Sequence, residues 1–490
     1  MEAKCKGKYI PPHKRGLIAS ETQTSKFEAF INKKDSESAE SSWGRRDRRN
    51  GLLDTKILTE TEAFFSQVKL ESEGFEENMP IDISENFPEM TSFEDCEVHQ
   101  TLLENIKKLR YNKPTPIQKY SIPVSLQRRD LMACAQTGSG KTAAYLFPIV
   151  AKMLNDGPPQ SQTTVRGAVP VSLIMAPTRE LSIQIYEEAL KFTYRTGIRV
   201  VVVYGGADPK IQSRELDRGA DIIVATPGRL IDFTNRGRIT LNLVKYLILD
   251  EADRMLDMGF EPQIVMILEK MNKVRETGMF SATFPQSIQL LAADLMKDYI
   301  FLSVGRVGST TDNITQKLFM VDENEKREIL NQQIKDIKGL ILIFVETKRS
   351  ADFLCEYLRR MDYGCTTLHG DRTQPEREKA LSDFKHERYN ILVATDIAAR
   401  GLDIPNVNCV INFDTPNNIE DYVHRIGRTG RIGKKGIAIS FINEKNKPVV
   451  KELYSLLYEC NQEIPEWFED FYNSLVIKKP KAKRIYRNFN

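Results

Sequence analysis

A chain of 490 residues is too long for one ordinary hydrophobic core, so its length predicts two domains with flanking segments. With 41% apolar residues, 28% charged residues and a formal net charge of +3, the composition argues against fibrous, collagen-like and wholly disordered proteins. The seven Cys form no CxxC pair or Cys/His cluster, which argues against a disulfide framework and a zinc site. No apolar run approaches the roughly 20 residues that span a bilayer, so we expect no secretion signal, no membrane anchor and a reducing intracellular compartment.

The first 84 residues are expected to form a largely disordered arm, because their charges are segregated and long apolar runs are few. Residues 1–50 hold 12 Lys/Arg against 7 Asp/Glu, and residues 51–100 hold 2 against 13. The rest of the chain is divided, as a prediction, into a first domain, a linker, a second domain, a helical C-terminal extension and a basic tail: 85–305, 306–313, 314–445, 446–477 and 478–490.

Short β-branched runs alternate with amphipathic stretches beyond residue 100, a pattern typical of parallel βα units. The first set of runs lies at 130–136, 171–177, 198–206, 221–227, 246–253 and 278–283. The second set lies at 339–347, 365–370, 390–396, 408–414 and 436–443. Most end in small or polar residues, where an open α/β sheet places its ligand loops, so we predict two similar parallel sheets joined by a polar linker.

The segment AQTGSGKT, residues 135–142, follows a predicted buried strand and opens a predicted helix. In this context backbone N–H groups cradle phosphates, Lys141 reaches the β and γ phosphates, and the Thr142 hydroxyl serves Mg²⁺. The first position is Ala135 where the general pattern has Gly, and an ordinary Gly-rich turn is the alternative.

Acidic residues follow the strand YLIL at Asp250, Glu251 and Asp253. Asp250 is placed to hold Mg²⁺ through water, and Glu251 to orient and deprotonate an attacking water. A lone acidic pair after a strand is usually a solvated loop. The phosphate-binding loop predicted two strands away favours the catalytic interpretation.

With these motifs the chain resembles the DEAD-box RNA helicases over about residues 93–445, and stretches such as DEADRMLDMGFEPQI resemble the subgroup of Vasa and its translation-initiation relatives. The resemblance implies an α/β fold of two tandem RecA-like P-loop NTPase domains with parallel sheets, RNA-stimulated ATPase activity and the cofactors ATP and Mg²⁺. It also implies an adenine-reading Q motif at Phe93, Tyr111, Lys113, Thr115 and Gln118. The phosphate-binding loop then comprises Thr137, Gly138, Ser139, Gly140, Lys141 and Thr142.

Other roles implied by the resemblance lie at the ends of later strands. Ser281 and Thr283 would bond to the DEAD carboxylates and, with Asp253 and His424, couple hydrolysis to movement; caps of the next helix are the alternative for the two hydroxyls. Arg428 and Arg431 in HRIGRTGR resemble arginine fingers, and Asp403 resembles a ribose contact.

Contacts with the RNA backbone are expected from small, hydroxyl-bearing or cationic residues at strand ends, which suit phosphates and 2′-OH groups better than base edges. They are Pro177, Thr178, Arg179, Gly205, Gly206, Thr226, Pro227, Gly228, Arg229, Thr347, Arg372 and Thr395. PTRE and TPGR are also ordinary cap and turn sequences, so each residue has a structural alternative.

We therefore predict a helicase that separates RNA duplexes locally and remodels RNA–protein complexes in translation initiation, with an ATP-gated RNA clamp as the alternative. Expected partners are sequence-independent mRNA and initiation factors, the latter through KYIPPHKRG at 8–16. We expect no membrane or DNA partner and a cytoplasmic location. The basic tail at 478–490 is an RNA-binding segment or a nuclear-localisation patch.

Overall fold

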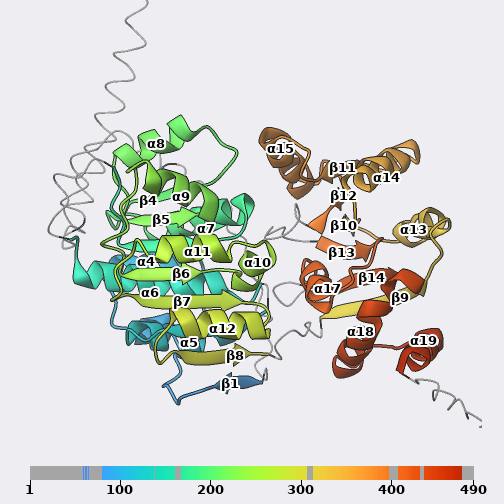
Figure 1. The fold of residues 1–490 in the computed structure, drawn as a ribbon, viewed down its shortest axis with the longest axis horizontal. Coiled ribbons are helices and arrows are strands. Elements are labelled where there is room, and N and C mark those ends of the chain that lie inside the picture. Colours follow the sequence, from blue (N-terminus) through green and yellow to red (C-terminus); the bar gives the residue numbers. More distant parts are fainter. Residues whose placement is uncertain are drawn as a thin grey trace, which may run out of the picture.

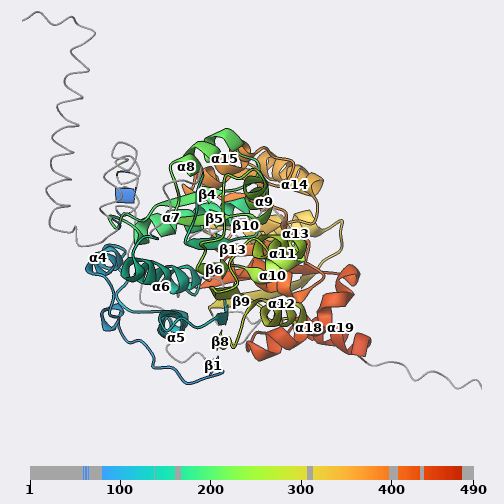
Figure 2. The same ribbon diagram turned by 60° about the vertical axis from the view of Figure 1, so that its left-hand side comes forward.

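The computed structural model describes residues 43, 59, 61, 62, 65, 80–136, 138–159, 167–305, 313–396, 407–430 and 435–476. These residues form two α/β domains, each with a central sheet and flanking helices (Figure 1). In the turned view the first domain, coloured blue to green, overlaps the second domain, coloured orange and red (Figure 2).

The first sheet has eight strands in the order β1-β8-β2-β7-β6-β3-β5-β4. All neighbours are parallel except β1 and β8. The strands are β1 (Ile81–Ile83), β2 (Leu131–Ala135), β3 (Ser172–Met175), β4 (Val200–Val203), β5 (Ile222–Ala225), β6 (Tyr246–Leu249), β7 (Glu276–Ser281) and β8 (Ile300–Val304). Most are buried along their whole length, because helices cover both faces of a parallel sheet.

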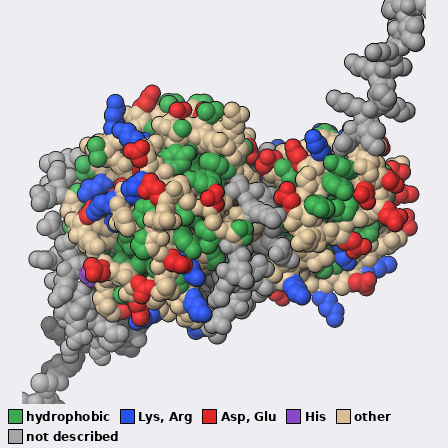
Figure 3. All heavy atoms as spheres, turned by 90° about the horizontal axis from the view of Figure 1, so that it is seen from below, with side chains coloured by type: hydrophobic (Ala, Val, Ile, Leu, Met, Phe, Trp, Pro, Cys, Tyr) green, Lys and Arg blue, Asp and Glu red, His purple; other side chains and the backbone are tan. Residues whose placement is uncertain are grey.

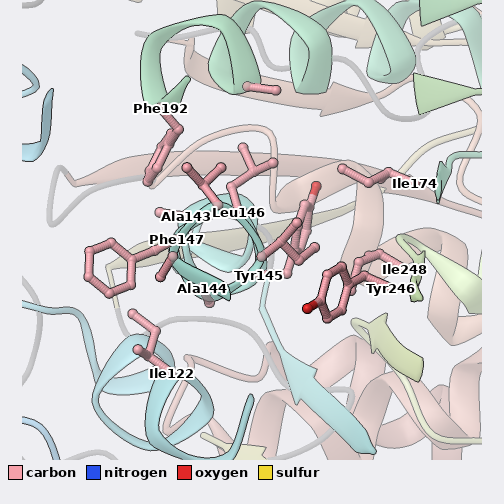
Figure 4. Close-up of a cluster of buried hydrophobic side chains, with 14 of the residues drawn as sticks. Ile122, Ala143, Ala144, Tyr145, Leu146, Phe147, Ile174, Phe192, Tyr246 and Ile248 are labelled. Atoms are coloured by element: carbon pink, nitrogen blue, oxygen red, sulfur yellow. The ribbon is translucent and has the colours of Figure 1, made fainter. Parts of the chain in front are cut away.

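Helices of the first domain pack in two layers. One face of the sheet carries α4 (Gln100–Lys108), α5 (Pro116–Leu126), α6 (Lys141–Asp156) and α7 (Arg179–Phe192). The other carries α8 (Pro209–Asp217), α9 (Pro227–Asn235), α10 (Ala252–Asp257), α11 (Glu261–Leu268) and α12 (Gln286–Leu295). A short 3₁₀ helix, η1 (Phe93–Asp95), precedes α4. Helix α6 forms the centre of one core, with apolar side chains around most of its circumference (Figure 4).

The second sheet has six parallel strands in the order β11-β12-β10-β13-β14-β9. They are β9 (Ile314–Met320), β10 (Leu340–Phe344), β11 (Cys365–Leu368), β12 (Ile391–Ala394), β13 (Val407–Asn412) and β14 (Gly436–Ile442). The helices of this domain are α13 (Lys326–Ile334), α14 (Lys348–Arg360), α15 (Gln374–Lys385) and α17 (Ile419–Ile426). After the 3₁₀ turn η2 (Glu444–Asn446), α18 (Lys447–Glu459) and α19 (Glu466–Val476) form the C-terminal extension.

The predicted fold class is confirmed. Each predicted β-branched run overlaps a strand, and three further strands were not predicted: β1, β8 and β9. Strand β1 begins at Ile81, a few residues before the expected start of the first domain, and pairs with β8. No helix in the described ranges is long and apolar enough to cross a membrane.

Part of the N-terminal arm packs against the first domain. The Trp43 side chain is fully buried in the core around α6, and its indole N–H donates to the carbonyl of Met153 at 2.8 Å. The Phe65 ring lies edge-on to Tyr194, with centroids 5.2 Å apart. Burial of large aromatic side chains is strongly favourable, so Trp43 and Phe65 pack stably against the first domain.

Candidate active site and RNA interface

The loop between β2 and α6 has the backbone of a phosphate-binding loop. Gly138 and Gly140 have φ of +81° and +91°, in the left-handed region that favours glycine. A Cβ added at Gly140 would lie 2.6 Å from Nε2 of Gln118 and 3.0 Å from Oγ1 of Thr115, so the close approach to α5 also requires glycine. Thr137 lies outside the described residues.

Side chains of this loop are held by its own carbonyl groups. The Ser139 hydroxyl donates to the carbonyl of Gln136 at 2.8 Å, and the Lys141 ammonium donates to the carbonyl of Ala135 at 2.9 Å. Lys141 and Thr142 form the first turn of α6, whose unpaired N–H groups and dipole favour an anion. A phosphate at this helix end would give Lys141 a charged partner in place of a carbonyl.

Gln118 joins the Q motif to the phosphate-binding loop. Its Oε1 accepts from the backbone N–H of Thr115 at 3.0 Å, and its Nε2 donates to the carbonyl of Gly140 at 3.1 Å. An amide oxygen has two lone pairs and an amide nitrogen two hydrogens, so one of each remains for a base edge. Adenine reading by Gln118 stays a prediction that this geometry permits.

The aromatic residues expected at the adenine site lie at different depths. The Phe93 ring is buried, and its centroid lies 5.4 Å from that of Phe147 and 6.2 Å from that of Tyr111. Core packing therefore accounts for Phe93. Tyr111 is half-buried and Lys113 is exposed, so both retain surface for a ligand.

Asp250 directly follows β6, and both of its carboxylate oxygens accept hydrogen bonds. Oδ1 accepts from the backbone N–H of Glu251 at 2.9 Å, and Oδ2 accepts from the Tyr145 hydroxyl at 3.0 Å. Burial raises the pKa of Asp250 to about 6, although Lys141 and the hydrogen bonds oppose this rise. A nearby cation would favour the charged form of this carboxylate.

Glu251 has a strained backbone, and one of its carboxylate oxygens makes no hydrogen bond with any described residue. It has φ of +50° and ψ of +53° at the N-cap of α10, a conformation that is unfavourable for a residue with a Cβ. Its buried Oε2 has no hydrogen-bond partner in the described part of the chain and lies 3.7 Å from Nε of Arg254. A water beside Glu251 would supply the missing hydrogen bond.

Asp253 connects the DEAD motif to the SAT motif and to the second domain. Its Oδ2 accepts from the backbone N–H and the hydroxyl of Thr283 at 3.0 and 2.9 Å, and lies 3.6 Å from Nε2 of His424. Burial raises the pKa of Asp253, but His424 and Arg254 outweigh burial and hold it well below its usual value. The hydroxyl of Ser281 makes no hydrogen bond with any described residue, so only Thr283 contacts a DEAD carboxylate as expected.

Helix α17 brings the beginning of the motif HRIGRTGR, with His424, to the inter-domain face. The Arg425 guanidinium pairs with both carboxylate oxygens of Asp396 at 2.5 Å and donates to the carbonyl of Asp414 at 2.6 Å, so Arg425 is fixed within its own domain. Nε of Arg428 donates to the carbonyl of His424 at 3.2 Å, and the Arg428 side chain is buried. Arg431 and Asp403 lie outside the described residues.

The expected RNA contacts of the first domain follow the neighbouring strands β3, β5 and β4. Thr178 caps α7, with its hydroxyl accepting from the N–H of Leu181 at 3.3 Å. A Cβ at Gly206 would lie 1.9 Å from Nη1 of Arg179, so the glycine loop leaves room for this guanidinium. The remaining residues of this group, Pro177, Gly205, Thr226, Pro227, Gly228 and Arg229, follow the same strand ends.

Three RNA contacts expected in the second domain follow β10, β11 and β12, which are adjacent in the sheet. The Thr347 hydroxyl caps α14, accepting from the N–H of Ser350 at 3.0 Å. Arg372 donates to Asp352 at 2.8 Å, and Thr395 is buried after β12. On the face shown in Figure 3, Lys and Arg side chains are scattered among Asp and Glu.

Two contacts between the domains were not predicted from the sequence. Nη2 of Arg377 lies 2.7 Å from Oε1 of Glu180, and Nη1 of Arg179 donates to Oε1 of Gln374 at 3.3 Å. They join the start of α15 to the start of α7 on the side of the expected RNA contacts. With His424 near Asp253, both halves of the inter-domain face are therefore in contact.

The residues around Asp250 suit magnesium. Asp250 and Thr142 offer carboxylate and hydroxyl oxygens, and Oε2 of Glu251 has no hydrogen bond to any residue that the structure describes. Within the described ranges no cluster of three or more His, Cys, Asp or Glu could enclose a metal ion. Magnesium commonly keeps several waters and takes other ligands from substrate phosphates, so a sparse set of oxygen ligands is sufficient.

Fold and site together define a nucleoside triphosphatase with a phosphate-binding loop and two RecA-like domains. The family model "DEAD/DEAH box helicase" matches residues 115–291, and "Helicase conserved C-terminal domain" matches residues 325–433. The chain belongs to the DEAD-box helicase family and is an ATP-dependent RNA helicase with RNA-dependent ATPase activity.

Solved structures of this family resemble the chain over most of its length. Mss116p bound to single-stranded RNA and AMP-PNP is 30% identical, covers 81% of this chain and 84% of its own, and has a TM-score of 0.67. S. cerevisiae Dbp5 bound to RNA and ADP BeF₃ is 29% identical, with coverages of 79% and 99% and a TM-score of 0.66. The yeast splicing factor Prp28 is 35% identical, with coverages of 83% and 94% and a TM-score of 0.45.

Proposed function

We propose that the chain separates RNA strands locally by closing its two domains over one strand when ATP binds, and reopens after hydrolysis. The observation that carries this proposal is the paired contact across the face between the domains. His424 approaches Asp253 beside the phosphate-binding loop, and Arg377 pairs with Glu180 beside the expected RNA contacts. A ligand that favours this closed arrangement on one side therefore favours it on the other.

The proposed chemistry is attack of water on the γ-phosphate of ATP. Lys141 holds the β and γ phosphates, Glu251 orients the water and accepts its proton, and Arg428 and Arg431 stabilise charge on the transferred phosphoryl group. Thr142 and, through water, Asp250 would hold Mg²⁺, which would neutralise phosphate charge. Gln118 reads the adenine base, and Asp403 contacts the ribose.

The proposed RNA contacts are sequence-independent. N–H groups at the starts of α7 and α9, the Thr178 and Thr347 hydroxyls and the Arg179 guanidinium suit phosphates and 2′-OH groups. Dbp5 and Mss116p have been solved in complex with RNA, which supports RNA binding by this chain. The basic tail would add non-specific phosphate contacts or serve nuclear targeting.

A finer assignment follows from resemblance to the Vasa subgroup and its translation-initiation relatives. We infer that the chain acts on mRNA in the cytoplasm during initiation, with the segment at 8–16 engaging initiation factors. The domain limits predicted from the sequence, 85–305 and 314–445, remain part of this proposal, with the first domain extended to include β1.

Crosslinking in cells followed by sequencing of the bound RNA tests the initiation role. We expect reads to be enriched several-fold in mRNA 5′ leaders relative to coding regions, because initiation remodels leaders. A variant lacking residues 8–16 should keep RNA binding and lose the enrichment. Reads spread evenly along transcripts, or concentrated on non-coding RNA, would contradict the initiation role and leave the helicase assignment intact.

A further inference from the structure

Tyr145 places a phenolic hydroxyl inside the core, next to the proposed magnesium site. It lies on α6, one turn beyond Thr142, and its side chain is 1% exposed. Its hydroxyl donates to Oδ2 of Asp250 at 3.0 Å. Figure 4 shows the ring on the side of α6 that faces Ile174 and Ile248 of the sheet.

The same side chain contacts two further elements of the site. Thr142 lies three residues earlier on the same face of α6. The Tyr145 ring packs edge-on against Phe280, with centroids 5.1 Å apart and an interplanar angle of 60°. Phe280 precedes Ser281 of the SAT motif on β7, so the Tyr145 side chain links α6, Asp250 and the strand that leads into the SAT motif.

We propose that Tyr145 is a positioning residue that sets the orientation of the Asp250 carboxylate relative to Thr142, and thereby the affinity for Mg²⁺. This inference rests on the proposed roles of Asp250 and Thr142. The terminal torsion of an aspartate is soft, so its carboxylate needs partners to hold it. The Glu251 N–H holds Oδ1 at 2.9 Å, and the Tyr145 hydroxyl holds Oδ2.

A tyrosine at position 145 suggests a role for the hydroxyl, because the aromatic ring alone would be enough for core packing. A phenylalanine would fill the same space against Phe280 and the sheet, but it would leave Oδ2 without this donor. Groups that orient a metal-binding side chain affect metal affinity by about 10–100-fold when they are removed. Magnesium held partly through water should respond at the lower end of this range.

Tyr145→Phe tests the proposal through magnesium dependence. Binding of a fluorescent ADP is measured as a function of Mg²⁺ concentration, and again without metal in EDTA. We expect the Mg²⁺ concentration at half-saturation to rise about tenfold, with metal-free ADP affinity unchanged. The ATPase rate should recover to within about twofold of wild type at saturating Mg²⁺, because Tyr145 touches no reacting atom.

Tyr246→Phe is the matched control. Tyr246 is also a buried tyrosine of the first domain, and its hydroxyl donates to Asp156 at 2.9 Å, at the opposite end of α6 from Thr142. This variant loses an equivalent phenol–carboxylate hydrogen bond and should keep the wild-type magnesium curve. Melting temperatures of both variants report any general loss of stability.

Three results would overturn the role of Tyr145: an unchanged magnesium curve for Tyr145→Phe, an equal shift for Tyr246→Phe, or equal weakening of ADP binding with and without metal. The Asp250→Asn variant tests separately whether Asp250 binds Mg²⁺, on which the proposed role of Tyr145 depends. If Asp250→Asn leaves the magnesium curve unchanged, Asp250 is not a metal-binding group, and the proposed function loses its magnesium site.

Discussion

The Glu251→Gln protein should bind RNA tightly in the presence of ATP and fail to turn over. The change preserves shape and removes the carboxylate that accepts a proton from water. The groups proposed to hold ATP, including Lys141, Thr142 and Asp250, remain in place. We expect hydrolysis to fall by about 10²–10⁴-fold, the usual contribution of a general base.

The trapped complex should also hold RNA for longer. If ATP and RNA both favour the closed arrangement, ATP should slow RNA release at least about tenfold, or roughly 1.4 kcal/mol of coupling. Stopped-flow fluorescence of labelled RNA measures this lifetime. In wild type the same ATP should shorten the lifetime once hydrolysis begins.

Two outcomes would contradict this account of Glu251. Rapid ATP-driven RNA release by the variant would mean that another group is the base, and loss of ATP binding would mean that Glu251 holds the nucleotide. The same measurement on the wild-type protein distinguishes a helicase that remodels RNA from an ATP-gated RNA clamp. Prompt release after hydrolysis indicates a remodeller, and prolonged retention with ADP and phosphate indicates the RNA clamp.

Arg428→Ala should abolish RNA-stimulated hydrolysis while sparing ATP binding. Arginine fingers contribute about 10³–10⁵ in rate by stabilising charge that develops in the transition state, so a loss of at least about 10³-fold is expected. Steady-state ATPase measured with saturating RNA gives the rate, and fluorescent nucleotide titration gives the affinity. Arg428→Lys should recover only a small part of the rate, because an ammonium lacks the planar fork of donors.

Arg425 provides the contrast for this prediction. Its guanidinium forms an ion pair with Asp396 and donates to the backbone carbonyl of Asp414 within the second domain, and its side chain is buried. Arg425→Ala should therefore lower the melting temperature, since the change removes the partner of the Asp396 carboxylate and of the Asp414 carbonyl. An Arg428→Ala protein with near-normal turnover, or one that melts like Arg425→Ala, would contradict the finger assignment.

Sequence patterns predicted most of the sheet architecture because fully buried parallel strands are continuous β-branched runs. Strand β9 escaped prediction because it lies at a sheet edge, where buried and exposed residues alternate. Strand β1 has only three residues and is recognisable by its pairing with β8. Trp43 was missed because one buried ring carries no periodic signal.

The phosphate-binding loop and the DEAD motif could be predicted because binding of phosphate and Mg²⁺ requires particular residue types at a fixed spacing. The contacts of Arg377 and Gln374 were not, since QPER reads as the first turn of a helix and their partners lie almost 200 residues earlier. Tyr145 was overlooked for a similar reason. On an apolar helix a tyrosine looks like core, and only the neighbouring Asp250 reveals a use for its hydroxyl.

The central claim is that ATP and RNA share one closed state, and reciprocal binding measurements on the Glu251→Gln protein test it most directly. RNA affinity is measured with and without ATP, and ATP affinity with and without RNA. The account predicts mutual tightening by the same factor, about tenfold or more, and a smaller but still equal factor in a protein that also carries Arg377→Ala. Independent binding of the two ligands, with a factor near one in both directions, would contradict it.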